Sequence, residues 1–268
     1  MLRLALAIAI ALPLHAQEPE REPPSKELVE SVLDTLKRAF ASGESGERLR
    51  ALEAARDVVH EDVVVLVARG LKDKEIEVRT AALEILRYHE HPRALAELER
   101  AHAKNKEFGE KKDEARAELV LAIGQHASPG SLKLLARGSL DSVRKHTTRA
   151  RIQALGRIRS KDAVEELIAL MNKAGRGRQG QGSQFQSDLR LSLWALTGTD
   201  EGRVREDWQR WWNDNKRDLR LPEEPSSEPR QLAQRWRRAW ATPEDGERKG
   251  SGRKQRGDDS SGDGPPLD

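Results

Sequence analysis

A recurring pattern of apolar positions occupies the middle of the chain. Five anchor residues each have an aliphatic residue three positions earlier and another apolar residue one position earlier. The anchors are Ala55, Leu86, Ile123, Leu155 and Leu196. The first four also have aliphatic residues nine and twelve positions later, as in Val64 and Val67 after Ala55. Spacings of three and four residues place side chains on one face of a helix, so the pattern predicts pairs of helices.

The spacing of the anchors indicates how these pairs are organised. Successive anchors lie 31, 37, 32 and 41 residues apart, the range of stacked helical units. Turn residues such as His91-Pro92 and Ser160-Lys161-Asp162 separate the two helices of a pair. The surplus length falls at 105–112 and 175–183, between units, where insertions leave stacking intact. We therefore expect an all-α solenoid over residues 26–216, with capping helices at its ends.

The residue pattern of the units resembles that of the HEAT repeat family, in the short bacterial form grouped with phycobilin-lyase-type repeats. The segments that carry the resemblance are Val78–Leu83, Ala122–Gly124 and Ala154–Ile158, together with an Arg seven positions before the anchor at Arg48, Arg79 and Arg116. The resemblance implies a right-handed solenoid of about five helix pairs that serves as a binding scaffold. Thr148 stands where the fourth unit would have its Arg.

A tryptophan-rich segment follows the repeats. Trp208, Trp211 and Trp212 form one helical stripe after Leu196-Thr197-Gly198. This segment resembles an element that accompanies HEAT-like repeats in exported bacterial proteins, and we expect it to cap the last unit. The alternative is a stacking or sugar-binding platform. Residues 217–242 are expected to form a linker and a last helix, in which Trp236 and Trp240 lie one turn apart beside arginines.

The two ends of the chain predict export and disorder. Met1-Leu2-Arg3, an apolar run at 4–14 and Ala16 are typical of a signal peptide over 1–16. The run is too short for a spanning helix, so we expect no transmembrane span in the mature protein and a periplasmic or extracellular location. An uncleaved anchor is the alternative. The Pro- and Glu-rich spacer at 17–25 and the polar tail at 243–268 have the composition of disordered segments.

Export can be tested on the protein recovered from cell-envelope fractions. We expect mass spectrometry to find an N-terminus near Gln17, because the small residue Ala16 ends the apolar run. Recovery of intact Met1 peptides would instead indicate a retained membrane anchor.

Composition narrows the possible chemistry. Charged residues make up 35% of the chain, yet the formal net charge is only +3, so charge alone gives little reason to expect nucleic-acid binding. The absence of Cys excludes disulfides, thiol nucleophiles and thiolate metal sites. His89-Glu90-His91 has a spacing that can bind metal, but no third ligand is nearby and we expect a hydrated turn. We therefore predict no catalytic, cofactor or metal site.

Basic residues gather in the fourth unit, at Arg144, Lys145, Arg149, Arg151 and Arg157. We interpret them as surplus to packing and predict that they bind an acidic protein partner; an ordinary solvated helix face is the alternative. The preferred function is a noncatalytic exported scaffold that binds protein along a groove lined by its second helices. The alternative function is an accessory or lyase-like subunit that holds a small ligand in the concave groove. A pocket of convergent polar groups would favour the second.

Overall fold

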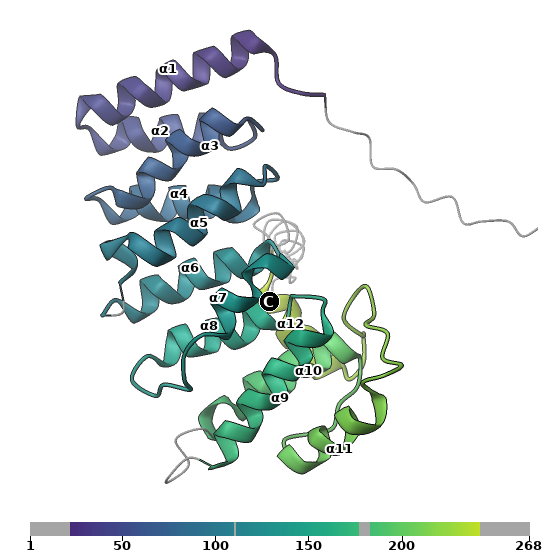
Figure 1. Cartoon of the computed structure of the whole chain (residues 1–268). Helices are drawn as coiled ribbons and strands as arrows, with labels where there is room; N and C mark the ends of the chain where they lie inside the picture. The colour runs from purple at the N-terminus through teal and green to yellow at the C-terminus, as the bar shows by residue number, and fades with distance from the viewer. Residues whose placement is uncertain (1–21, 110, 177–182, 242–268) are drawn as a thin grey trace, which may run out of the picture.

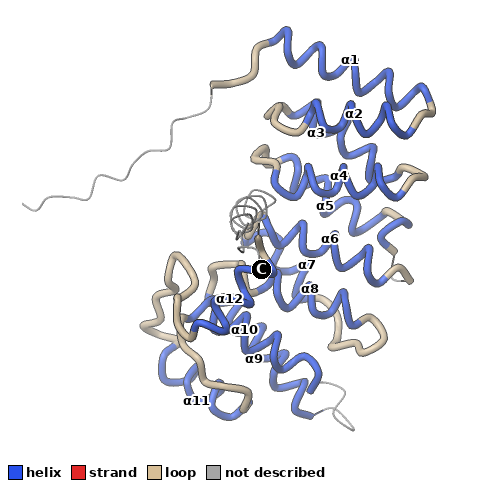
Figure 2. Tube along the Cα trace, turned by 180° about the vertical axis from the view of Figure 1, so that it is seen from behind, coloured by secondary structure: helices blue, strands red, loops and turns tan. Residues whose placement is uncertain are grey.

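The structure, a computed structural model, describes residues 22–109, 111–176 and 183–241. Throughout these ranges the regular elements are helices, and no strand occurs in them (Figure 2). The all-α prediction is therefore confirmed for this part of the chain. The predicted signal peptide at 1–16, the tail at 243–268 and most of the spacer at 17–25 lie outside the described residues.

Twelve α-helices are present in the described ranges. They are α1 (Lys26–Ser42), α2 (Ser45–Ala55), α3 (Glu61–Val67), α4 (Ile76–Tyr88), α5 (Arg93–Lys104), α6 (Asp113–Gln125), α7 (Leu132–Ala136), α8 (Lys145–Leu155), α9 (Lys161–Arg176), α10 (Gln186–Thr197), α11 (Arg205–Asn215) and α12 (Arg230–Ala239). Short 3-10 turns accompany them at η1 (Ala68–Lys72), η2 (Lys106–Phe108), η3 (Pro129–Ser131) and η5 (Ser183–Phe185). No helix among the described residues is long and apolar enough to cross a bilayer.

The helices are stacked in the order of the chain (Figure 1). The helices that contain the anchors, α2, α4, α6, α8 and α10, are called the first helices below, and each packs against the next. On the other side of the stack, α1 packs on α3, α3 on α5, and α9 on α11. The last helix, α12, turns back and packs on α10.

The predicted anchors form the spine of the core. Ala55, Leu86, Ile123, Leu155 and Leu196 are all fully buried, and so are most residues three positions before them. The slot one position before the anchor is buried in four of the five units, while Ala54, near the end of α2, is exposed. Leu95 and Leu132, on the second helices, are half-buried. The register read from the sequence therefore matches the buried faces of the helices.

Two glycines allow neighbouring first helices to approach closely. A Cβ atom on Gly124 would lie 2.5 Å from the Cβ of Ala154, and one on Gly156 would lie 2.7 Å from the Cβ of Ser192. Real carbon atoms do not approach so closely, so any side chain at these positions would push the helices apart. Each glycine directly follows an anchor, so the same position in two successive units contacts the next first helix.

Two of the three arginines seven positions before the anchors, Arg79 and Arg116, join the end of one helix pair to the next first helix, whereas Arg48 binds the end of its own pair. Arg79 donates to the carbonyl oxygen of Asp73 (2.7 Å), and Arg116 donates to that of Phe108 (2.8 Å). Arg48 forms an ion pair with the Asp73 carboxylate (2.6 Å), in which both side chains are buried. Carbonyls at chain reversals lack helical partners, and the guanidinium groups of Arg79 and Arg116 satisfy them.

Four of the five tryptophans in the C-terminal segment are buried, whereas Trp211 of the predicted stripe is half-buried. Trp208 and Trp212 lie in the core where α11 packs on α9, and the indole of Trp208 donates to the Gly202 carbonyl oxygen (3.0 Å). Trp236 and Trp240 are each only 6% exposed. These four rings stabilise packing and present no open face for stacking a sugar or a base.

Candidate functional site

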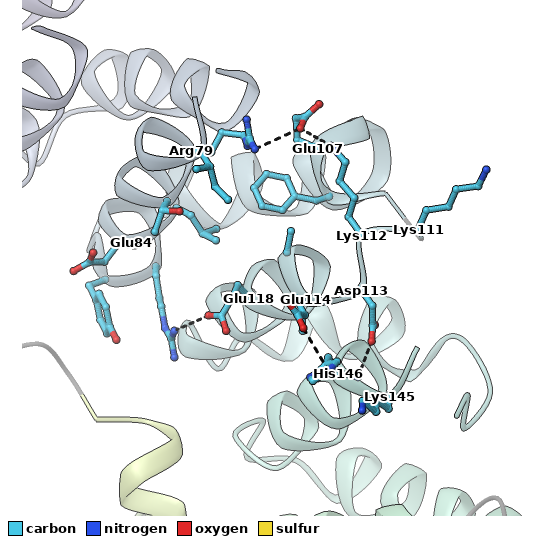
Figure 3. A pocket seen from close by; sticks show the side chains of 18 of the residues that line it. Arg79, Glu84, Glu107, Lys111, Lys112, Asp113, Glu114, Glu118, Lys145 and His146 are labelled. Atoms are coloured by element: carbon cyan, nitrogen blue, oxygen red, sulfur yellow. Dashed lines mark hydrogen bonds and ion pairs between the residues drawn. The ribbon is translucent and has the colours of Figure 1, made fainter. Parts of the chain in front are cut away.

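A groove of about 1290 Å³ runs along α4, facing the N-terminal half of α6 and the turn before α8 (Figure 3). The residues that α4 contributes recur at helical spacing, from Ile76 through Arg79 and Leu83 to Arg87. They form one stripe along the whole of α4. Because an α-helix rises 1.5 Å per residue, the groove is about 20 Å long. It is lined by first helices and η2, whereas the predicted partner-binding groove is lined by second helices, so that prediction stays untested.

The floor of the groove is apolar and its rims carry exposed apolar side chains. Leu83, Phe108 and Ala117 line it and are buried in the core. Ile76 is 61% exposed and Val143 is 85% exposed, on opposite sides of the groove. The described residues contain four exposed large hydrophobic side chains, and two of them lie here. Apolar side chains exposed around one depression mark a surface suited to binding another molecule.

The walls of the groove are charged, and most of these charges pair with one another between helices (Figure 3). The pairs are Arg79 with Glu107 (3.7 Å), Arg87 with Glu118 (3.8 Å) and His146 with Glu114 (3.9 Å). Lys112 also binds Glu107 and is the main cause of the lowered pKa of that carboxyl. Lys111 and Lys145 form no ion pair within the described ranges. The walls thus offer mixed charge and little net field.

His89 and His91, which have a spacing suited to metal binding, are held by hydrogen bonds within their own turn. His89 is 5% exposed; its Nδ1 accepts from the backbone N–H of His91 (3.1 Å) and its Nε2 faces the Val58 carbonyl oxygen (3.4 Å). His91 in turn accepts from the N–H of Arg93 (3.1 Å). Burial lowers the pKa of His89, because desolvation disfavours the charged ring. The expected hydrated turn is therefore wrong for His89, whose ring is buried in the turn between α4 and α5.

Among the described residues, no group of three or more His, Asp or Glu side chains is placed to hold a metal ion.

The five basic residues predicted to bind a partner do not form one surface. Lys145 lines the groove along α4, whereas Arg144 and Arg151 line a second pocket between α5, α7 and α8. Arg149 lies 3.4 Å from the Asp188 carboxylate of α10, and Arg157 stacks on Trp240 at 4.7 Å from its ring centroid. Residues two positions apart on a helix point in different directions, so proximity in sequence did not imply a shared face.

The interpretation that these side chains exceed what packing needs is also wrong for two of them. Arg151 donates to four carbonyl oxygens, those of Leu135 (2.9 Å), Ala136 (3.3 Å), Gly138 (3.1 Å) and Ser139 (3.3 Å). It thereby satisfies the end of α7, in the unit where Thr148 replaces the expected Arg. Burial, followed by the nearby Arg159 and Arg87 charges, lowers the pKa of Arg157 to about 10. Partner binding by these five residues stays a prediction. The reason given for it, that the side chains exceed what packing needs, does not hold for Arg151 and Arg157.

The sequence reading missed the contribution of the first insertion to the groove. The segment 105–112 was expected to be a loop between units, yet η2 places Phe108 in the groove floor and Glu107 in its wall. A lone phenylalanine among lysines was the available signal, because an apolar ring in a polar insertion usually finds a packing partner.

Comparison of the chain with models of protein families gives no match, and comparison with curated proteins gives none either. The likeness to HEAT repeats therefore remains a resemblance of sequence pattern.

Proposed function

We propose that this chain is a noncatalytic, exported, HEAT-like scaffold whose groove along α4 binds a segment of a partner protein. The observation that supports this most is the groove itself, open and about 1290 Å³ in volume, with Ile76 and Val143 exposed on its two sides. Small-molecule sites usually measure about 300 to 1,000 Å³ and enclose their ligand. An open groove of larger volume better suits a polypeptide.

The proposal includes a right-handed solenoid of about five helix pairs. The row of first helices, each packed on the next, supports it, as do the equivalent close contacts at Gly124 and Gly156. In this arrangement α1 covers the first unit, while α11 and α12 cover the last. Each unit would bury its apolar face only against its neighbours, so both ends require a cover.

The chain's own last helix supports the kind of segment proposed. Through Trp236 and Trp240, α12 is anchored against first helices, and Trp240 approaches the position of Gly124 in α6. The hydroxyl of Tyr88 donates to the carbonyl oxygen of Ala241 (3.3 Å), and Ala241 lines one end of the groove. The same face that binds α12 thus continues into the groove. We infer that the partner presents an amphipathic helix with apolar anchors, in the manner of helix-in-groove recognition.

The alternative function, a subunit that holds a small ligand, receives less support at this groove. The charged side chains of the groove largely pair with one another across its walls, as Arg87 does with Glu118. Fewer hydrogen-bond donors are therefore left for a ligand. A small-ligand site would place a few polar groups around a mostly enclosed cavity.

Photocrosslinking can test the proposed groove. A benzophenone amino acid at Thr80, an exposed groove residue, is expected to crosslink a protein from envelope extracts. The same probe at Ser31, an exposed residue of α1, is the positional control. The Thr80 adduct should decrease when Ile76 and Val143 are both replaced by Asp, because charged side chains would have to be desolvated on binding.

A matched control separates the groove from general surface chemistry. Val204 is also exposed, at 52%, but does not line the groove, so Val204→Asp should leave the Thr80 adduct unchanged. Equal crosslinking from Ser31 and Thr80, or an adduct insensitive to Ile76→Asp with Val143→Asp, would contradict a partner site in the groove.

A further inference from the structure

A second pocket lies on another side of the molecule, between α5, α7 and the turn that leads into α8. Its volume is about 610 Å³, within the usual range of small-molecule sites. Five cationic side chains line it, those of Arg116, Lys133, Arg137, Arg144 and Arg151, against the two carboxylates of Glu99 and Asp141. The pocket therefore has a surplus of three positive charges, which equals the formal net charge of the whole chain.

Both carboxylates of the pocket already have partners. Glu99 accepts a hydrogen bond from the hydroxyl of Ser131 (2.7 Å). Asp141 accepts from the Arg144 side chain (2.7 Å) and from the backbone N–H of Val143 (2.8 Å). Glu166 of α9 also attracts Arg151, but the hydrogen bonds that Arg151 donates go to neutral carbonyl oxygens. Carbonyl groups satisfy its donors without cancelling its charge, so the positive surplus persists.

Two of the cations are held in place by the backbone. Arg151 is bound at the end of α7, and Arg116 donates to the carbonyl oxygens of Phe108 (2.8 Å) and His102 (3.4 Å). Their positive field acts on the ring of His102: burial, then Arg116 and Arg151, lower its pKa to about 4. The pocket thus has a fixed positive wall, and an anion that enters it meets charges that need no reorganisation.

The rim contains two further cations that remain available for a ligand. Lys133 and Arg137 lie one turn apart on α7 and its C-cap, so they share a face. Both are exposed, and neither forms a hydrogen bond or ion pair with another part of the described chain. Guanidinium and ammonium groups placed this way bind oxyanions through charge-assisted hydrogen bonds.

We propose that this pocket binds a small multivalent oxyanion, carried by a phosphate or by an organic polycarboxylate, with Lys133 and Arg137 as its direct ligands. The fixed charges of Arg116 and Arg151 attract the anion, and the two rim side chains close on it. The site is separate from the groove along α4, since no residue lines both.

Calorimetric titration of the full chain with inorganic phosphate and, separately, with citrate tests this proposal, at constant ionic strength set by sodium chloride. We expect saturable binding of at least one of the two. Lys133→Ala with Arg137→Ala should weaken it by about tenfold or more, because two charge-assisted contacts are lost. The matched control is Lys37→Ala with Arg38→Ala on α1, which removes the same charge from exposed residues far along the chain. The control should bind as the unmodified chain does.

The outcomes distinguish the ligand classes and the two proposals. Binding of phosphate alone indicates a phosphate-bearing ligand, and binding of citrate alone indicates a polycarboxylate; either supports the site. Absence of saturable binding for both anions, or equal weakening by the two double variants, would overturn it. The Thr80 crosslink depends on the groove and should survive Lys133→Ala with Arg137→Ala, so failure of one proposal leaves the other testable.

Discussion

Replacing Leu86 or Leu155 by Ala is expected to lower the free energy of unfolding by about 2 to 5 kcal/mol for each substitution. Both side chains are fully buried, at the anchor positions of α4 and α8. Truncation removes apolar surface from the core and leaves a cavity that the rigid neighbouring helices fill only in part. Equilibrium denaturation with urea, followed by helical circular dichroism, measures the change.

The control for this prediction is Leu28→Ala in α1. Leu28 is 47% exposed, so the same truncation there should change the free energy of unfolding by only about 0.5 kcal/mol. If Leu86→Ala and Leu155→Ala were as mild as Leu28→Ala, the anchors would not form the spine of the core.

Arg151→Glu is expected to destabilise the fold by about 2 to 4 kcal/mol, far more than a charge reversal on a solvated helix face. The substitution removes the donor from four carbonyl oxygens at and after the end of α7. It also places a carboxylate among those oxygens, which repel it. Chemical denaturation, with the midpoint and slope both recorded, shows whether the loss is one of stability alone.

Lys145→Glu is the matched reversal for Arg151→Glu. Lys145 belongs to the same helix and is exposed at the rim of the groove along α4, so we expect a change within about 1 kcal/mol. Similar midpoints for the two variants would show that the Arg151 hydrogen bonds contribute little, and would restore the view of Arg151 as a surplus surface charge.

The helices and their buried faces could be predicted because they depend on local chemistry. Ser25, a residue type that favours the N-cap position, caps α1 through its hydroxyl oxygen, which accepts from the N–H of Leu28 (3.2 Å). The anchors Leu86 and Leu155 were placed by spacings of three and four residues, which follow from the pitch of the helix alone. Trp208 was likewise placed on a helical stripe by its spacing to Trp211 and Trp212, and it is buried in the core.

The candidate sites, by contrast, depend on contacts between segments distant in the chain. Phe108 meets Leu83 in one groove only because α4 and α6 pack side by side, which their separate patterns do not encode. Arg157 became a packing residue because α12 returns to place Trp240 against it. The role of a charged side chain is equally hard to predict from the sequence. An arginine side chain can extend into water or donate hydrogen bonds to backbone carbonyl oxygens. Periodicity thus determined which residues of this protein are inside, and tertiary packing alone decided which charges remained available to a ligand.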